Sequence, residues 1–287
     1  MQLNNIGKWK VFSLDTGFFS LDGGAMMGSV PKVLWEKTNP SDSLNRIDLA
    51  LRCLLVDDGE NIVLVESGIG HKYSDKFQKI FNIRQRNNAL SNTLSKLGYS
   101  NKDITHVILT HLHFDHSGGA LSLKENGEVV PVFPNAKYYI SKENWNVALN
   151  PSPRDSASYI KDNYIALCDS EVLNLVPENS TILDGIDTYV VNGHTTGQQL
   201  VKIYDCDCVP VFCSDLIPLE SHLKLPWIMG YDLNAALTLK EKKKFLDLAS
   251  DNGWLLFFYH DPNTIAVKIR KTDKYYEVIE KYERRKN

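Results

Sequence analysis

One stretch, residues 111–119, constrains this chain more than any other, because it reads HLHFDHSGG and holds three of the eight histidines in the 287-residue sequence. The seven residues before it, 104–110 (ITHVILT), are apolar or β-branched, which predicts a buried strand. Histidine and aspartate are poor core residues but good metal ligands. A strand that ends in several of them therefore predicts a polar site rather than a piece of core.

The spacing inside this stretch favours a metal site. In an extended chain His111, His113 and Asp115 share one side, while His116 points elsewhere at a helix start marked by residues 117–119. One short segment thus offers ligands to two neighbouring ions. A solvated loop explains a single histidine, but HxHxDH at a strand end favours metal. Three imidazoles and a carboxylate suit zinc best, with manganese, iron and cobalt as alternatives.

Further ligands are expected at the ends of other strands. His194 follows DTYVVNG, Asp215 follows VPVFCS and His260 follows WLLFFY. Each residue alone fits an ordinary polar loop as well as a ligand. Their shared position after apolar runs favours metal binding for the set.

The chain alternates strand-like and helical patterns without a linker or short repeat, which predicts one α/β layered domain over residues 1–287. The expected strands are 10–14, 49–56, 61–66, 104–110, 188–191, 199–204, 209–213 and 254–259. The expected helices are 88–97, 142–149, 156–167 and one from Leu239 to Gly253, with Thr238 and Glu241 as a capping box.

Composition excludes several classes of protein. The net charge of −3 argues against a nucleic-acid partner, and the KEKKK run at 240–244 is interpreted as a solvated helix face. The C-terminal YERRKN is interpreted as a charged tail. Neither a membrane span nor a signal peptide is visible, so we expect a soluble cytoplasmic protein. Five cysteines without a CxxC pair predict buried, reduced thiols.

The HxHxDH pattern, followed by His194, Asp215 and His260, resembles the metallo-β-lactamase superfamily in order, approximate spacing and strand-end placement. The resemblance implies a four-layer αββα sandwich and two divalent metal ions, with zinc expected. It implies one ion on His111, His113 and His194, a second on Asp115, His116 and His260, and Asp215 as the bridge between them.

A second stretch, residues 22–32 (DGGAMMGSVPK) together with Trp35, resembles the N-acyl homoserine lactonase and organophosphate-hydrolase branch. That branch implies a hydroxide between two metals that opens an ester-type bond of a small molecule, here a lactone, with Asp115 and Asp215 as catalytic residues. A thioesterase of the hydroxyacylglutathione hydrolase kind, a phosphotriesterase and a non-catalytic metal-binding scaffold stay open as alternatives.

Two positions depart from the family. Glu66 stands where the family has an aspartate, and a longer carboxylate can still orient a ligand histidine from behind. Pro218 stands where some lactonases have a tyrosine that contacts the substrate carbonyl. We expect Tyr231 or His222 to supply that contact, with structural roles for both as the alternative.

An apolar pocket for an acyl chain is expected near the N-terminal segment and near residues 227–229, with core packing as the alternative. The sequence also allows a homodimer formed through the N-terminal segment. The residues expected to meet substrate are Phe18, Met26, Met27, His222, Trp227 and Tyr231, with Phe19, Ile228 and Met229 as additional apolar surface.

Overall fold

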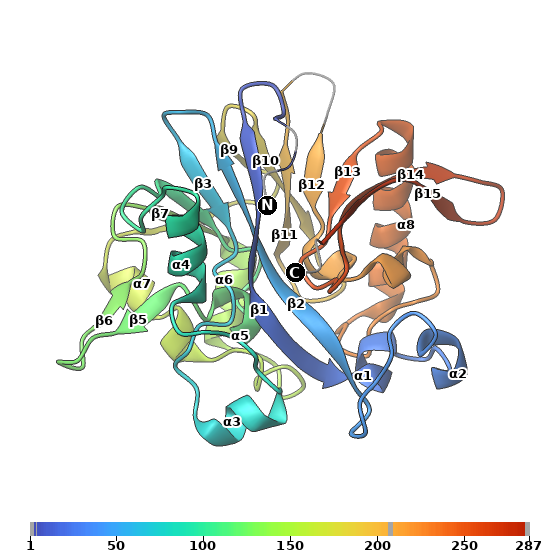
Figure 1. Cartoon of the computed structure of the whole chain (residues 1–287), viewed down its shortest axis with the longest axis horizontal. Coiled ribbons are helices and arrows are strands. Elements are labelled where there is room, and N and C mark those ends of the chain that lie inside the picture. Colours follow the sequence, from blue (N-terminus) through green and yellow to red (C-terminus); the bar gives the residue numbers. More distant parts are fainter. Residues whose placement is uncertain (1–2, 4, 206–208, 285–287) are drawn as a thin grey trace.

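The computed structural model describes residues 3, 5–205 and 209–284, and its centre is formed by two large β-sheets with helices on both flanks (Figure 1). The first sheet has the strand order β1-β2-β3-β4-β7-β8, and the second has the order β15-β14-β13-β12-β11-β10-β9. Their facing sides share one hydrophobic core. This arrangement confirms the expected αββα sandwich.

The first sheet consists of β1 (Lys10–Asp22), β2 (Arg46–Asp57), β3 (Ile62–Val65), β4 (His106–Ile108), β7 (Lys137–Ser141) and β8 (Leu173–Val176). The second consists of β9 (Thr181–Leu183), β10 (Ile186–Val191), β11 (Gln198–Ile203), β12 (Pro210–Phe212), β13 (Leu255–Phe257), β14 (Thr264–Lys271) and β15 (Tyr276–Glu283). A separate pair joins β5 (Leu121–Leu123) to β6 (Val129–Pro131).

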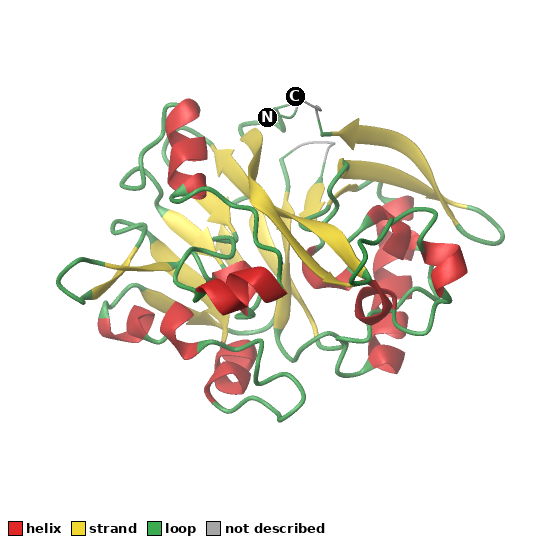
Figure 2. Ribbon diagram, turned by 60° about the horizontal axis from the view of Figure 1, so that its bottom comes forward, coloured by secondary structure: helices red, strands yellow, loops and turns green. Residues whose placement is uncertain are grey.

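Most helices lie on the periphery of the molecule, around the central sheets (Figure 2). Helix α4 packs on β1, α6 on β7 and β8, and α8 on β14. The helices are α1 (Gly23–Met27), α2 (Lys32–Trp35), α3 (Asp75–Ile80), α4 (Ala89–Lys96), α5 (Phe114–Ser117), α6 (Lys142–Leu149), α7 (Ala166–Asp169) and α8 (Ala235–Asp251), with 3-10 turns η1 (Lys161–Asn163), η2 (Ser214–Leu216) and η3 (Glu220–Leu223). None of the helices in the described ranges has both the length and the apolar character of a membrane span.

Strand direction decides where the polar segments meet. Strands β3, β4 and β7 are mutually parallel, and so are β12 and β13. Strand β10 runs the same way as β12, because β11 pairs antiparallel with both. The carboxyl ends of these strands therefore gather at one edge of each sheet. The segments that follow β3, β4, β10, β12 and β13 carry the predicted polar residues.

A buried arginine joins the two sheets beside this edge. Arg52 of β2 is fully buried and donates from Nη1 to the carbonyls of Phe258, Asp261 and Thr264, at 3.2, 2.7 and 3.0 Å. Its Nε donates to Asp15 at 3.0 Å. These bonds hold the loop after β13, which contains His260, against the first sheet.

Several sequence-based expectations about the elements are wrong. Residues 156–167 form turns, η1 and the start of α7 instead of one helix, because the backbone carbonyl of Ser158 accepts from Phe114 in the tertiary structure. Residues 117–119 end a helix rather than start one, since Ser117 is the last residue of α5 and Gly118 is its C-cap. The strands β14 and β15 had no predicted counterpart, and β15 includes the beginning of the expected tail up to Glu283.

Helix α8 starts earlier than predicted. Asn234 caps it by accepting from the backbone of Leu237, and Glu241 instead accepts from Asn192 and Gly193. Within the KEKKK run Lys242 is buried and donates to two backbone carbonyls of the 224–227 loop, so only part of the run faces solvent. Burial lowers the pKa of Lys242 to about 7.

The cysteine expectation holds in part. Cys53 and Cys213 are buried and free, whereas Cys168 is free but exposed. Cys206 and Cys208 lie outside the described residues.

We expect Arg52→Met to lower the free energy of unfolding by about 3 kcal/mol, because three buried carbonyls and one carboxylate lose a donor. Urea denaturation followed by circular dichroism measures this change. Arg84→Met is the matched control, since Arg84 forms an exposed ion pair with Asp48 and its loss should cost about 1 kcal/mol or less. Equal losses for the two variants would contradict a special role for Arg52.

Candidate metal centre

The seven predicted ligand residues converge at the shared strand edge. They come from the segment after β4, from α5 and from the segments after β10, β12 and β13, and none is more than 8% exposed. Three groups of side chains in the described residues have ligand atoms within 4.8 Å of one another; one consists of Glu66, His111 and His116, and the other two match the predicted ligand sets. Of these two, the first group is His111, His113 and His194, and the second is Asp115, His116 and His260.

The nitrogen spacings in the first group match a metal polyhedron. Nδ1 of His113 lies 3.0 Å from Nε2 of His111 and 3.3 Å from Nε2 of His194. A tetrahedron with zinc–nitrogen bonds of about 2.05 Å has edges of about 3.3 Å. One proton cannot serve both contacts of this His113 nitrogen, so a cation fits the arrangement better than hydrogen bonding does.

The second group has the same character. Nε2 of His116 and Nε2 of His260 face each other at 3.3 Å. Oδ2 of Asp115 lies 3.6 Å from the former and 3.4 Å from the latter. Two imidazole nitrogens and a carboxylate oxygen thus converge on one point.

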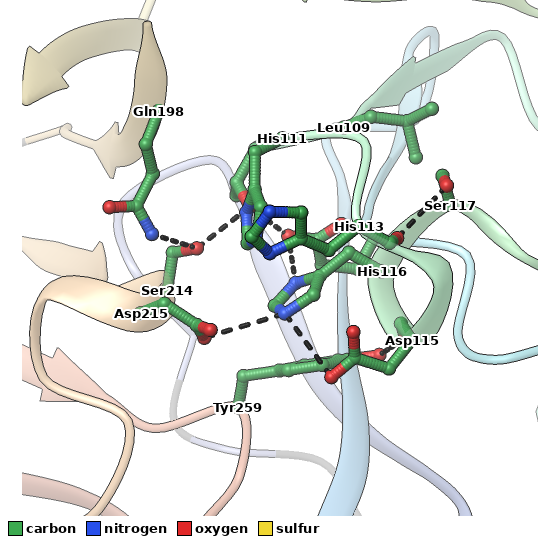
Figure 3. A network of polar contacts seen from close by, with 12 residues as sticks. Leu109, His111, His113, Asp115, His116, Ser117, Gln198, Ser214, Asp215 and Tyr259 are labelled. Carbon is green, nitrogen blue, oxygen red and sulfur yellow. Dashed lines mark hydrogen bonds and ion pairs between the residues drawn. The ribbon is translucent and has the colours of Figure 1, made fainter. Parts of the chain in front are cut away.

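Asp215 lies between the groups. Its Oδ2 is 3.4 Å from Nε2 of His194, while its Oδ1 is 3.4 Å from Nε2 of His116 and 3.3 Å from Nε2 of His260. Figure 3 shows its carboxylate pointing toward His116 from the side opposite Asp115. Each oxygen of Asp215 therefore faces a different group.

The other ring nitrogen of most ligand histidines has a partner that fixes the ring. Nδ1 of His116 contacts Glu66 at 3.1 Å, and Nδ1 of His194 contacts Asp232 at 2.9 Å. Nδ1 of His260 contacts the carbonyl of Ala50 at 3.0 Å. Such contacts set the tautomer and direct Nε2 toward the centre. Glu66 thus contacts a ligand histidine, as expected from its position behind the site.

Asp232 was missed by sequence reasoning. It lies in the loop before α8, follows no strand and forms no spacing motif with the other ligands, so only its burial against His194 reveals it. The loop that carries His194 is also held by Glu241, and Gly193 packs so closely on α8 that a Cβ would lie 2.3 Å from Oγ1 of Thr238.

The buried carboxylates and imidazoles of the site favour a bound cation. Burial raises the pKa of Asp215, but His116 and His260 outweigh it and hold that pKa well below its ordinary value. Burial lowers the pKa of His116, yet Asp215, Asp115 and Glu66 outweigh it and raise that pKa well above normal. Burial keeps the pKa of His111 and of His113 well below normal, so both rings are neutral ligands.

Comparison with known families decides the classification. The family model described as the metallo-beta-lactamase superfamily matches residues 49–260 of this chain. The chain belongs to this superfamily. It is a metal-dependent hydrolase, and its histidine and aspartate groups can hold a divalent metal ion.

Individual relatives of the superfamily are distant in sequence and close in structure. An N-acyl homoserine lactonase of Bacillus sp is 24% identical over 230 residues, which cover 75% of this chain and 82% of the lactonase. The crystal structure of a probable metal-dependent hydrolase from Staphylococcus aureus aligns with a TM-score of 0.90 and 26% identity, covering 99% of this chain and 100% of that one. AidC, a dizinc quorum-quenching lactonase solved with a product, aligns with a TM-score of 0.81 and 23% identity over 98% of this chain and 97% of AidC.

The superfamily centre opens into a cavity of about 500 Å³. Five of the seven predicted ligand residues line it, namely His113, Asp115, His194, Asp215 and His260. The remaining lining is largely apolar. It consists of Leu21, Met26, Phe81, Phe114, Arg154, Asp155, Ala157, Ser158, Met229, Gly230 and Tyr231.

The residues expected to meet substrate are only partly at this cavity. Met26, Met229 and Tyr231 line it. Phe18 instead packs under the guanidinium groups of Arg84 and Arg284. Met27, His222 and Trp227 are buried behind the wall, where they support it from the core.

His222 shows how such support works, because its Nε2 lies 3.0 Å from the carbonyl of Met26, which lines the cavity. Phe19 is fully buried and packs its ring on His260 at 5.5 Å. Sequence reasoning missed Phe81, Phe114 and the 154–158 segment, whose patterns resemble ordinary core and loop.

We expect bound divalent metal to stabilise the fold. Zn²⁺ at about 1,000 times its dissociation constant should add about 4 kcal/mol to the free energy of unfolding. Asp232→Asn should reduce zinc affinity about 10- to 100-fold, since His194 loses a charged acceptor. Chelator competition and thermal unfolding with and without Zn²⁺ measure both effects. Asp187→Asn, which changes an aspartate bonded to Thr181 away from the site, should leave affinity unchanged. A metal-free protein as stable as the zinc-loaded one would contradict the expectation.

Proposed function

We propose that the chain is a dinuclear lactonase, and the observation that carries the proposal is the paired ligand groups on either side of Asp215. In this proposal one ion is held by His111, His113 and His194 and the second by Asp115, His116 and His260. Asp215, whose two oxygens face different groups, would help to hold both ions. Zinc suits the nitrogen-rich donor set best.

Charge balance supports a count of two. Four buried carboxylates contact the histidines of the centre, and no lysine or arginine within residues 3, 5–205 and 209–284 forms an ion pair with any of them. Four negative charges equal the charge of two divalent cations. Uncompensated buried charge is costly, so a single divalent ion would leave half of it unmatched. The carboxylates are Glu66, Asp115, Asp215 and Asp232.

The cavity supports an ester-type substrate with an apolar tail. Leu21, Met26, Phe81, Phe114 and Met229 offer apolar surface next to the centre, and its volume of about 500 Å³ suits a small molecule. The N-acyl homoserine lactonase among the relatives and AidC act, by their names, on lactones. An N-acyl lactone has both required parts, a strained ester and an acyl chain.

The residues of the chain divide the work of ring opening. Bound divalent ions would supply an activated water and would neutralise negative charge on the substrate oxygen. Asp115 lines the cavity and lies beside both His116 and His260, so its carboxylate is placed to accept a proton from the attacking water and to hand it to the departing ring oxygen. The hydroxyl of Tyr259 donates to the backbone carbonyl of Asp115 at 2.6 Å, which holds this segment in position. The ring C–O bond breaks, water adds and a hydroxy acid leaves.

Some lactonases have a tyrosine at the position of Pro218. In this chain Tyr231 performs its role. It lines the cavity, and burial, with Asp22 and Asp115 nearby, raises its pKa to about 12. Its hydroxyl is therefore neutral at physiological pH and can donate a hydrogen bond to the substrate carbonyl. His222 cannot make this contact, because it lies behind Met26.

A substrate panel tests the proposal. Zinc- and manganese-loaded protein should hydrolyse N-acyl homoserine lactones faster than simple lactones, thioesters or a phosphotriester, and kcat/KM should rise with acyl length. Asp215→Ala should lose metal and most of the turnover. Hydrolysis of only a thioester or a phosphotriester would overturn the lactone assignment and keep the centre, whereas an Asp215→Ala variant with full activity would overturn the dinuclear centre.

We expect Tyr231→Phe to lower kcat for a lactone about 100-fold with a smaller change in KM, because the lost hydrogen bond strengthens as charge develops on the carbonyl oxygen. Steady-state kinetics measure the two parameters separately. Tyr275→Phe, in the exposed hairpin between β14 and β15, is the matched control and should match wild type. An unchanged kcat in Tyr231→Phe would remove Tyr231 from the reaction.

A further inference from the structure

One hydroxyl connects the two ligand groups from behind. Thr110, fully buried between β4 and the ligand segment, has three polar neighbours at Oγ1: Glu66 Oε1, His111 Nδ1 at 3.0 Å and Ser214 Oγ at 2.7 Å. Glu66 also contacts Nδ1 of His116 at 3.1 Å. Histidines of different groups therefore meet the same carboxylate, one directly and one through Thr110.

Donor and acceptor counting allows one consistent assignment. A threonine hydroxyl has one proton and two lone pairs. The carboxylate oxygen of Glu66 accepts that proton. With Nε2 of His111 facing the centre, its Nδ1 carries a proton and donates to Thr110, which leaves the second lone pair for the Ser214 hydroxyl.

Ser214 fits the same direction of bonding. Its Oγ accepts from Nε2 of Gln198 at 3.0 Å, so its own proton is free to point at Thr110 (Figure 3 shows the Gln198–Ser214 bond). Ser214 adopts a left-handed backbone conformation, with φ of +46°, and directly precedes Asp215. A residue of this type rarely adopts that φ, so the bond to Thr110 helps to hold the turn that presents Asp215.

We propose that Thr110 is a positioning residue that makes the two halves of the metal centre depend on each other. Its hydroxyl orients His111 in one group. It also contacts Glu66, which in turn orients His116 in the other group, and it steadies the turn that carries Asp215. The proposal rests on the metal centre described above but not on the identity of the substrate. It predicts that one buried hydroxyl governs the affinity for both ions.

The backbone at this position is held independently of the side chain. The carbonyl of Thr110 accepts from the backbone of Gln199 at 2.8 Å, and the carbonyl of Leu109 accepts from the Gln199 side chain at 3.1 Å. Thr110→Val keeps these bonds and the shape of the side chain while it removes the hydroxyl. Thr110→Ser keeps the hydroxyl.

The residue before β4 provides a matched control. Thr105 also precedes a histidine, and its Oγ1 lies 2.8 Å from Nδ1 of His106. His106 stacks on Tyr139 and belongs to neither ligand group. Because Thr105 also exchanges hydrogen bonds with the backbone of Ile62, Thr105→Val should lower stability without weakening metal binding.

The test is a metal titration of the full chain after chelator treatment, with Zn²⁺ competed against a chromophoric chelator and Co²⁺ followed by its visible spectrum. Thr110→Val should bind both ions about 10- to 100-fold more weakly than wild type, with an altered cobalt spectrum. Thr110→Ser should bind both ions with an affinity within about three-fold of wild type, because it keeps the hydroxyl. Thr110→Ala replaces the valine variant if valine misfolds at this buried position.

Three outcomes would overturn the relay. Wild-type affinity for both ions in Thr110→Val would show that the hydroxyl does not position the ligands. Weaker binding of one ion only would show that the two ligand groups do not depend on each other through Thr110. An equal loss of affinity in Thr105→Val would reduce the effect to general destabilisation. A wild-type chain that takes up neither ion would instead overturn the metal centre itself, whatever Thr110 does.

Discussion

The structure depends on the concentration of acidic and imidazole groups at the meeting point of two sheets. Four carboxylates and five imidazoles lie there with almost no exposure to water. Removing such groups from water is tolerated only when cations and hydrogen bonds compensate. The nitrogen-to-nitrogen distances of 3.0–3.3 Å show that the protein already holds its donors at the spacing of a metal polyhedron.

This preorganisation comes from the second layer around the ligands. Glu66, Asp232 and the Ala50 carbonyl each fix one ring. Arg52 and Glu241 act one step further out, since they hold the loops that carry His260 and His194. Few of these contacts lie within one element, so the centre exists only when both sheets are in place. Metal affinity and stability of the fold are therefore expected to change together.

The cavity is built differently from the metal centre. Its walls come from segments far apart in the chain, which include the end of β1, the 154–158 turn and the 229–231 loop. The side chain of Arg154 donates to the carbonyl of Gly230 at 2.5 Å, and the backbone of Gly230 donates to Ala25 at 2.8 Å. Two loops and helix α1 are thus tied together at the cavity. Changes in these loops can alter substrate choice without moving the ligands.

The sequence by itself determined the candidate ligands and the class of fold. HxHxDH after a β-branched run, and single polar residues after other apolar runs, predicted the strand-end placement of His111, Asp215 and His260, because strand periodicity and strand ends are local properties. The tertiary structure alone decided which polar groups stand behind the ligands and which apolar residues reach the cavity. Asp232, Thr110 and Phe81 have no local signal, and Met26 differs from its neighbour Met27 only in the direction that packing gives it. Such distinctions depend on contacts between distant segments, which no pattern along one chain contains.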